Sequence, residues 1–245
     1  MKKILFTLAL VVSFSSFGQY DFKQGLVTEY YESGKVKSKT NYVYGQIQGE
    51  YIEYYESGKV KFSGNYVDGK RQGERIVYFR SGEVESKSNY LNGFLNGELI
   101  ECYESGVVES KGNFVDGKKQ GEWIENYESG AIKSKGNFVD GQPQGEAIGH
   151  YESGAVSYKL NFVDGKEQGE QIGYYKSGVV SSKFNFVDGV KQGEEIGYFR
   201  SGEVKWKVNY VDGKKQGEEI IGYYDENGEI KEIKDYYIDG ELIKD

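Results

Sequence analysis

The chain has 245 residues and a formal net charge of −8, and it contains 35 glycines but only one proline and one cysteine. An acidic chain is a poor candidate for binding nucleic acid or anionic lipid, because both depend on clustered lysine and arginine. A single cysteine excludes an intrachain disulfide bond.

Residues 1–18 are typical of a signal peptide. Two lysines precede an apolar run from Ile4 to Phe17 that is too short to span a membrane comfortably, and Ser16 and Gly18 are the small residues that cleavage needs. We expect a mature chain that begins at Gln19, located in the periplasm or, as the second choice, on the cell surface or in the medium. Loss of the two lysines lowers the net charge to about −10.

From Gly25 onward the chain repeats a unit of 24 residues. A fixed period of this length is the signature of a repeat array, so residues 19–245 are predicted to form one array. Positions are numbered 1–24 from the leading glycine of each unit. The eight units begin at Gly25, Gly49, Gly73, Gly97, Gly121, Gly145, Gly169 and Gly193, and a degenerate unit occupies residues 217–245.

Each unit predicts two β-strands and two turns. Position 7 is aromatic, position 12 is Val or Ile and position 18 is Tyr or Phe in all eight units. Ser-Gly at positions 9–10 predicts a two-residue hairpin turn that pairs position 8 with 11, 7 with 12, 5 with 14 and 3 with 16. Asp-Gly at positions 20–21 indicates a second, longer turn. The expected fold is all-β: an elongated, twisted, single-layer antiparallel meander of β-hairpin repeats.

Charge and volume change together at these predicted pairs, as cross-strand partners should. Glu56 and Lys59 in one unit become Arg80 and Glu83 in the next. A large side chain is expected to cover a cross-strand glycine. The pairs are Tyr51 with Gly64, Leu99 with Gly112, Trp123 with Gly136, Tyr158 with Gly149, and Trp206 with Gly197.

The repeat resembles the variant MORN repeat (membrane occupation and recognition nexus), in the bacterial form grouped with YwqK-type antitoxins. The resemblance rests on YYESGKVK at Tyr54–Lys61, GNYVDGK at Gly64–Lys70 and QGE at Gln72–Glu74, and it covers nearly the whole mature chain. It implies an elongated, twisted sheet used for recognition. Arrays of this kind serve as membrane-contact modules, scaffolds and proposed antitoxins.

No catalytic residue, metal ligand or cofactor site is expected. Cys102 and His150 both occupy position 6 and lack the neighbours that a nucleophile or a metal site requires. The acids at positions 2 and 20 recur from unit to unit, whereas an active site such as a carboxylate pair is normally made once. We expect the lysines at position 15 to pair with the glutamates at position 2. The protein is therefore not expected to be an enzyme.

The remaining candidate is a binding surface on one face of the sheet. Positions 3, 5, 14 and 16 vary between units while positions 7, 12 and 18 hardly vary, and repeat proteins usually build binding surfaces from variable residues on a constant frame. The alternative is that these side chains only fill space over the glycines. The candidate binding residues are Tyr51, Phe62, Leu99, Trp123, Tyr158, Leu160, Phe184 and Trp206.

The sequence therefore favours an exported, non-enzymatic scaffold with a protein partner, of the antitoxin or immunity kind that the resemblance implies. A carbohydrate or cell-wall binding module is the alternative, since Tyr and Trp rings can stack on sugars. A membrane-associated MORN module is the third hypothesis, although the acidic charge argues against membrane lipid as a partner. Nucleic acid is not an expected partner.

Overall fold

The computed structural model describes residues 23–243, so the predicted signal peptide at residues 1–18 lies outside the described residues. The described residues divide into two compact parts, residues 23–96 and 97–243. From here on these parts are called the first unit and the second unit, and the 24-residue segments are called repeats. The described part contains only strands, turns and loops, which confirms the all-β class. Residues 23–243 include no helix with the length and apolarity needed to cross a membrane.

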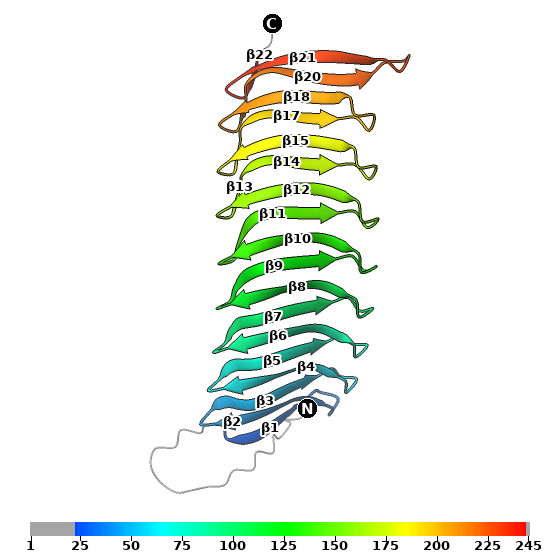
Figure 1. The fold of residues 1–245 in the computed structure, drawn as a ribbon. Helices are drawn as coiled ribbons and strands as arrows, with labels where there is room; N and C mark the ends of the chain where they lie inside the picture. Colours follow the sequence, from blue (N-terminus) through cyan, green and yellow to red (C-terminus); the bar gives the residue numbers. More distant parts are fainter. Residues whose placement is uncertain (1–22, 244–245) are drawn as a thin grey trace, which may run out of the picture. The chain divides into compact units, whose positions relative to one another are not determined.

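Strands of the first unit pair in chain order as an antiparallel meander (Figure 1). They lie in a single layer, as expected. The strands are β1 (Gly25–Tyr30), β2 (Val36–Val43), β3 (Gln46–Tyr54), β4 (Val60–Val67), β5 (Lys70–Tyr78) and β6 (Val84–Leu91), and β7 (Phe94–Cys102) contains the division between the units.

The second unit is built in the same way. Its longer strands are β8 (Val108–Val115), β9 (Lys118–Asn126), β10 (Ile132–Val139), β11 (Gln142–His150), β12 (Val156–Val163), β15 (Val180–Val187), β18 (Val204–Val211), β20 (Gly217–Tyr224) and β21 (Ile230–Ile238). The shorter ones are β13 (Lys166–Glu167), β14 (Gly169–Tyr174), β16 (Val190–Lys191), β17 (Gly193–Tyr198), β19 (Lys214–Lys215) and β22 (Glu241–Ile243).

The Ser-Gly turns differ from the two-residue turn that we predicted. The amide of Tyr55 donates to the carbonyl of Lys59 at 2.8 Å, and Gly58 has a φ of 89°. Position 7 therefore pairs with position 11 around a three-residue turn, in which glycine supplies the left-handed residue that such a turn needs. The predicted pairs 8 with 11 and 7 with 12 are wrong.

The rest of the predicted hairpin register is confirmed. Lys61 is an extra residue on β4, and this bulge brings Glu53 opposite Phe62 and Tyr51 opposite Gly64. Positions 5 and 14, and positions 3 and 16, therefore face each other as expected. The degenerate hairpin of β20 and β21 lacks the bulge, because its two extra residues lengthen the first strand instead.

The Asp-Gly turns are shorter than expected. Asp68 and Gly69 alone connect β4 to β5, and both have positive φ, 48° and 74°. This is the two-residue turn whose twist matches that of the flanking strands, and aspartate and glycine are the residues that tolerate it best. The residues after the turn belong to the next strand.

The leading glycine of a repeat forms a second bulge against the preceding strand, as the repeat that begins at Gly73 shows. Arg71 lies opposite Tyr66 and Arg75 lies opposite Gly64, so four steps along β5 match only two along β4. Gly73, between the two arginines, has a φ of 76°. The bulge brings positions 23 and 3 next to each other on one face of the sheet, although they are four residues apart in the chain.

One face of the sheet carries the buried side chains of the described residues. We call this face, with positions 3, 5, 14, 16 and 18, the packed face. Faces alternate along a strand, so positions 2, 4, 15, 17 and 19 form what we call the open face. The buried side chains are Ser38, Thr40, Ser88, Ser110, Trp123, Gln171, Phe186, Val208 and Glu219, all at positions 3, 14, 16 or 18.

Two rows of hydrogen bonds tie successive repeats together. The tyrosine hydroxyl at position 7 donates to the carbonyl of position 6 in the next repeat, at 2.6–2.8 Å. The glutamine side chain at position 24 accepts from the amide of position 20 in the next repeat, at 2.7–3.0 Å. The tyrosines are Tyr31 and Tyr55 in the first unit and Tyr103, Tyr127, Tyr151 and Tyr175 in the second.

Candidate functional site

The eight candidate binding residues all lie on the packed face. Trp123 is buried, with 8% of its surface exposed, and the other seven are half-buried. In the first unit Tyr51 stacks on Phe62, with ring centroids 5.0 Å apart and an interplanar angle of 18°. Burial raises the pKa of Tyr51, and the nearby Glu53 carboxylate adds to the effect. The candidates meet neighbours on adjacent strands and do not converge on one cleft.

At positions 5 and 14 the predicted covering of glycine by a large ring is confirmed. A Cβ atom on Gly149 would collide with the ring of Tyr158, and a Cβ atom on Gly197 would collide with that of Trp206. Tyr158 and Trp206 therefore help to pack their own hairpins.

At positions 3 and 16 the predicted covering is wrong, although the register is right. Trp123 is paired with Gly136, but its ring lies over Gly112 of the preceding repeat, where an added Cβ would collide with it. A Cβ on Gly136 would instead meet Ala147, at 3.3 Å. Position 16 lies between two position-3 residues, one in its own hairpin and one in the next, and backbone pairing alone does not determine which one covers it.

The same correction applies to the other two pairs at positions 3 and 16. A Cβ on Gly64 would meet Arg75 of the next repeat, at 3.6 Å, and not Tyr51. Gly112, expected beneath Leu99, lies beneath Trp123.

A row of cations on the packed face was not predicted from the sequence. Each residue of this cation row occupies position 23 and lies over the aromatic ring at position 18 of the following repeat, a contact typically worth about 0.5–1 kcal/mol at exposed sites. The recurring basic residue two places before the leading glycine was the signal that could have revealed it. The pairs are Lys23–Tyr42 and Arg71–Tyr90 in the first unit, and Lys119–Phe138, Lys191–Tyr210 and Lys215–Tyr237 in the second.

Two cations of the row have carboxylate partners at position 3. Lys191 lies 2.8 Å from Glu195, and Lys215 lies 2.6 Å from Glu219. In a regular strand, residues four apart are roughly 13 Å apart. The glycine bulge makes these ion pairs possible by bringing positions 23 and 3 together.

The first unit has two arginines in the corresponding places. Arg71 Nε donates to the Tyr66 hydroxyl at 3.2 Å, and this bond raises the pKa of Arg71. The guanidinium of Arg75 lies over the ring of Phe62, with 5.2 Å to the centroid. Both arginines line a shallow depression, together with Phe62, Gly64, Asn65, Tyr66, Gly73, Glu74 and Tyr90.

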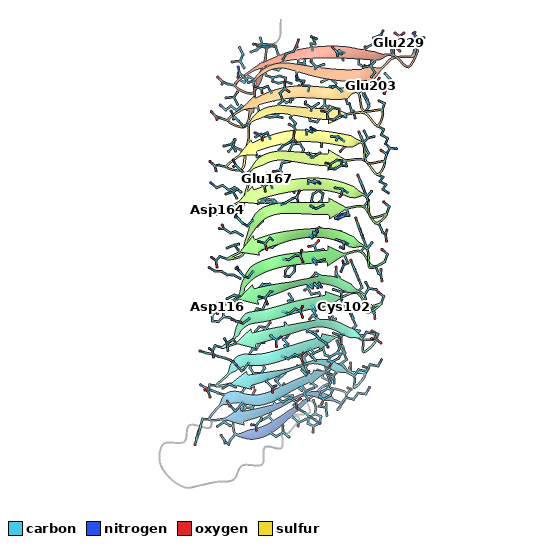
Figure 2. The ribbon with its side chains drawn as sticks, in the orientation of Figure 1. Cys102, Asp116, Asp164, Glu167, Glu203 and Glu229 are labelled. Carbon is cyan, nitrogen blue, oxygen red and sulfur yellow. The ribbon has the colours of Figure 1, made fainter. Side chains whose placement is uncertain are left out.

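Residues with catalytic chemistry are spread along the second unit. Figure 2 shows Cys102 near the edge with the Ser-Gly turns, whereas Asp116 and Asp164 lie at the opposite edge. His150 ends β11, and its carbonyl accepts the Tyr127 hydroxyl. Within residues 23–243, no three side chains of His, Cys, Asp or Glu gather as a metal site would require.

The open face carries ion pairs and a row of exposed apolar side chains. The predicted pairing of position 15 with position 2 is confirmed in Lys183–Glu170, at 3.5 Å, and Lys207–Glu194, at 2.5 Å. Position 19 forms what we call the valine row, whose members are 42–46% exposed. They are Val67 and Leu91 in the first unit, and Val115, Val139, Val163, Val187 and Val211 in the second.

These features define the protein as an antiparallel β-hairpin repeat array. The family described as MORN repeat variant matches residues 23–44, 47–68, 71–92, 119–140 and 167–188. These segments are variant MORN repeats, and the chain is a MORN-repeat protein. No curated protein sequence matches the chain.

Two solved structures show weak similarity to the chain. A porin-like protein from Bacteroides uniformis is 9% identical with a TM-score of 0.20, over 84% of this chain and 92% of that chain. The Tc holotoxin pore of Photorhabdus luminescens is 12% identical with a TM-score of 0.22, over 86% of this chain and 14% of that chain. These TM-scores are too low to indicate a shared fold.

Proposed function

We propose that this protein is an exported, non-enzymatic scaffold that binds a protein partner. The observation that carries the proposal is the constant frame: tyrosine side chains at position 7 and glutamine side chains at position 24, wherever they occur, bond the next repeat in the same way. On that frame, positions 3, 5, 14 and 16 differ from repeat to repeat. A rigid grid with changing side chains is suited to recognising an extended surface.

The distribution of exposed side chains supports a protein partner. The valine row gives regularly spaced apolar contacts on the open face, and the cation row gives charged contacts at one margin of the packed face. Mixed apolar and polar contact areas are typical of protein interfaces. Sugar binding would require free ring faces, but Trp123 is buried and the rings of Tyr158 and Trp206 pack on glycines.

Two further parts of the proposal rest on the sequence. Export is supported by the basic start, the apolar run and the small residues of residues 1–18. A non-enzymatic role is supported by the recurrence of the acids at positions 2 and 20, which suits ion pairs and turns better than catalysis. Within this proposal, an antitoxin- or immunity-like role is the finer alternative, and its support is the resemblance to YwqK-type repeats.

The test is an affinity capture with residues 19–245 and the envelope fraction of the source organism. A captured protein is then purified and its binding is measured directly. Val163→Lys with Val187→Lys disrupts the valine row, and Lys166→Gln, at an exposed turn-flanking residue, is the control. We expect direct binding that the double variant weakens and the control retains.

Three outcomes would contradict the proposal. A glycan captured in place of a protein would establish the carbohydrate alternative, and recovery on liposomes alone would establish the membrane one. Absence of any partner that binds as a purified protein would leave the array without a scaffold function. A protective effect against a co-expressed envelope toxin would support the immunity-like role specifically.

A further inference from the structure

We propose that Arg71 and Arg75 form a binding site for a carboxylate of an acidic segment in the protein partner, an inference that rests on the scaffold function proposed above. The two arginines belong to one strand, β5, and the bulge at Gly73 places them on the same face, opposite Tyr66 and Gly64 of β4. The backbone conformation at Gly73 therefore brings the two arginines together on one face of the sheet.

The charges of this pair are not neutralised within the described chain. No ion pair links Arg71 or Arg75 to a carboxylate of residues 23–243, although Glu74 lines the same depression. Arg71 donates to tyrosine hydroxyls and not to a carboxylate, and the Nε of Arg75 is buried without a hydrogen-bond partner. Two guanidinium groups without a carboxylate partner are stabilised by an external carboxylate that accepts charge-assisted hydrogen bonds from them.

The chain itself shows which group fits this geometry. In the second unit, the same two positions hold Lys191 with Glu195 and Lys215 with Glu219, and in both pairs the carboxylate of position 3 meets the cation of position 23. In the repeat that begins at Gly73, position 3 is Arg75, so a second cation stands where the second unit has a carboxylate. The missing group is therefore a carboxylate supplied from outside the array.

The surroundings favour a peptide as the source of this carboxylate. Guanidinium groups bind carboxylates through paired hydrogen bonds. The rings of Phe62, Tyr66 and Tyr90 line the depression and offer apolar contact to the methylene groups of an Asp or Glu side chain. The depression is shallow, and a single exposed ion pair contributes little. A ligand that adds contacts along the array, such as an acidic polypeptide segment, suits this site better than a small ion.

The test measures binding of a fluorescent poly-glutamate peptide to residues 19–245 by anisotropy, with a poly-glutamine peptide as the matched probe. We expect the acidic peptide to bind and the neutral one not to bind, with an affinity that falls as salt rises. Arg75→Glu recreates the arrangement of Lys191 and Glu195, so the chain's own carboxylate would occupy the site. This variant should fold and bind the peptide roughly tenfold to a hundredfold more weakly, as expected for a lost charged hydrogen bond.

Two further variants separate this site from the general charge of the protein. Lys191→Gln removes a cation that already has a carboxylate partner, so peptide affinity should change less than about twofold. Glu195→Arg places a second cation beside Lys191 and should add a second equivalent of bound peptide. Equal affinity for Arg75→Glu and the parent chain, at an unchanged unfolding midpoint, would overturn the proposal.

Competition identifies the source of the carboxylate. Displacement of the peptide by inorganic phosphate at equal concentration, or tighter binding of an oligogalacturonate than of poly-glutamate, would overturn the assignment to an acidic peptide. The captured partner is then tested with Arg75→Glu. Unchanged partner binding by this variant would remove the carboxylate site and leave the scaffold function standing, whereas absence of any protein partner would remove the scaffold function itself.

Discussion

The repeat around Trp123 and the repeat around Val208 fill the packed face in opposite ways. In the first, position 3 is a buried tryptophan and the position-16 residue beneath it is Gly112. In the second, position 16 is Val208, which is 2% exposed, and position 3 of the following 24-residue repeat is Glu219. In these two repeats one large side chain fills the space between positions 16 and 3, and either strand can supply it.

The difference also determines which polar groups can be buried. Where position 16 is large, the position-3 side chain is free to be polar, and it then finds partners nearby. The amide of Gln171 bonds the backbone N–H and C=O of Asn161, at 3.1 and 3.2 Å, and Glu219 pairs with Lys215. Buried polar groups are tolerated because these hydrogen bonds satisfy them.

The largest loss of stability is expected from a substitution that disturbs the packing around Trp123. Gly112→Val would put a branched side chain where the tryptophan ring lies, and overpacking of this kind costs about 3 kcal/mol. Gly136→Val is the matched control, because a Cβ there meets no ring and contacts only Ala147, whose Cβ lies at 3.3 Å. Urea unfolding should give a midpoint lowered far more by the first substitution. Equal midpoints would mean that the ring does not lie over Gly112.

The second-largest loss of stability is expected where the buried side chain is Val208 at position 16 and not a ring at position 3. Val208→Ala removes two methyl groups from a buried position and should cost about 2 kcal/mol. Val187→Ala removes the same atoms from the open face, where the side chain is 44% exposed, so the loss should be smaller. Thermal unfolding of both variants compares them. A larger effect at Val187 would show that the open face, and not the packed face, holds the core.

The third effect should be the same in both regions, because each contains a hydrogen bond from a position-7 tyrosine hydroxyl to a backbone carbonyl of the next repeat. Tyr127→Phe and Tyr175→Phe each remove a hydroxyl that donates to a backbone carbonyl, at 2.8 and 2.6 Å, and each should cost about 1 kcal/mol. Tyr236→Phe serves as the control, since its side chain is 52% exposed. Guanidinium unfolding measures all three, and an unequal loss at Tyr127 and Tyr175 would contradict a uniform frame.

The smallest effect concerns the hydrogen bond that the position-24 glutamine accepts from the position-20 amide of the next repeat. Gln120→Ala and Gln192→Ala remove acceptors of the Asp140 and Asp212 amides, at 3.0 and 2.9 Å, and each should cost about 0.5–1 kcal/mol. Hydrogen exchange should show faster exchange of those two amides specifically. Exchange rates that stay the same would indicate that the glutamine side chains do not hold the turns.

The sequence alone was sufficient to predict the repeat, the strands and half of the register. The 24-residue period, the recurring glycines and the aromatic positions are local signals, and paired changes such as Gly149 with Tyr158 report direct cross-strand contact. The three-residue Ser-Gly turn was missed because the bulge at Lys61 restores the predicted pairs farther along the strands.

Only the tertiary structure decided what joins one repeat to the next. The ring of Trp123 could have covered either of two glycines, and pairing within its own hairpin favoured the wrong one. Arg71 and Arg75 are far apart for a regular strand and become neighbours only through the bulge at Gly73. Periodicity specifies the hairpin because its contacts are local. The packed face depends on side chains that lean from one hairpin onto another, and the pairing of positions 23 and 3 depends on the glycine bulge.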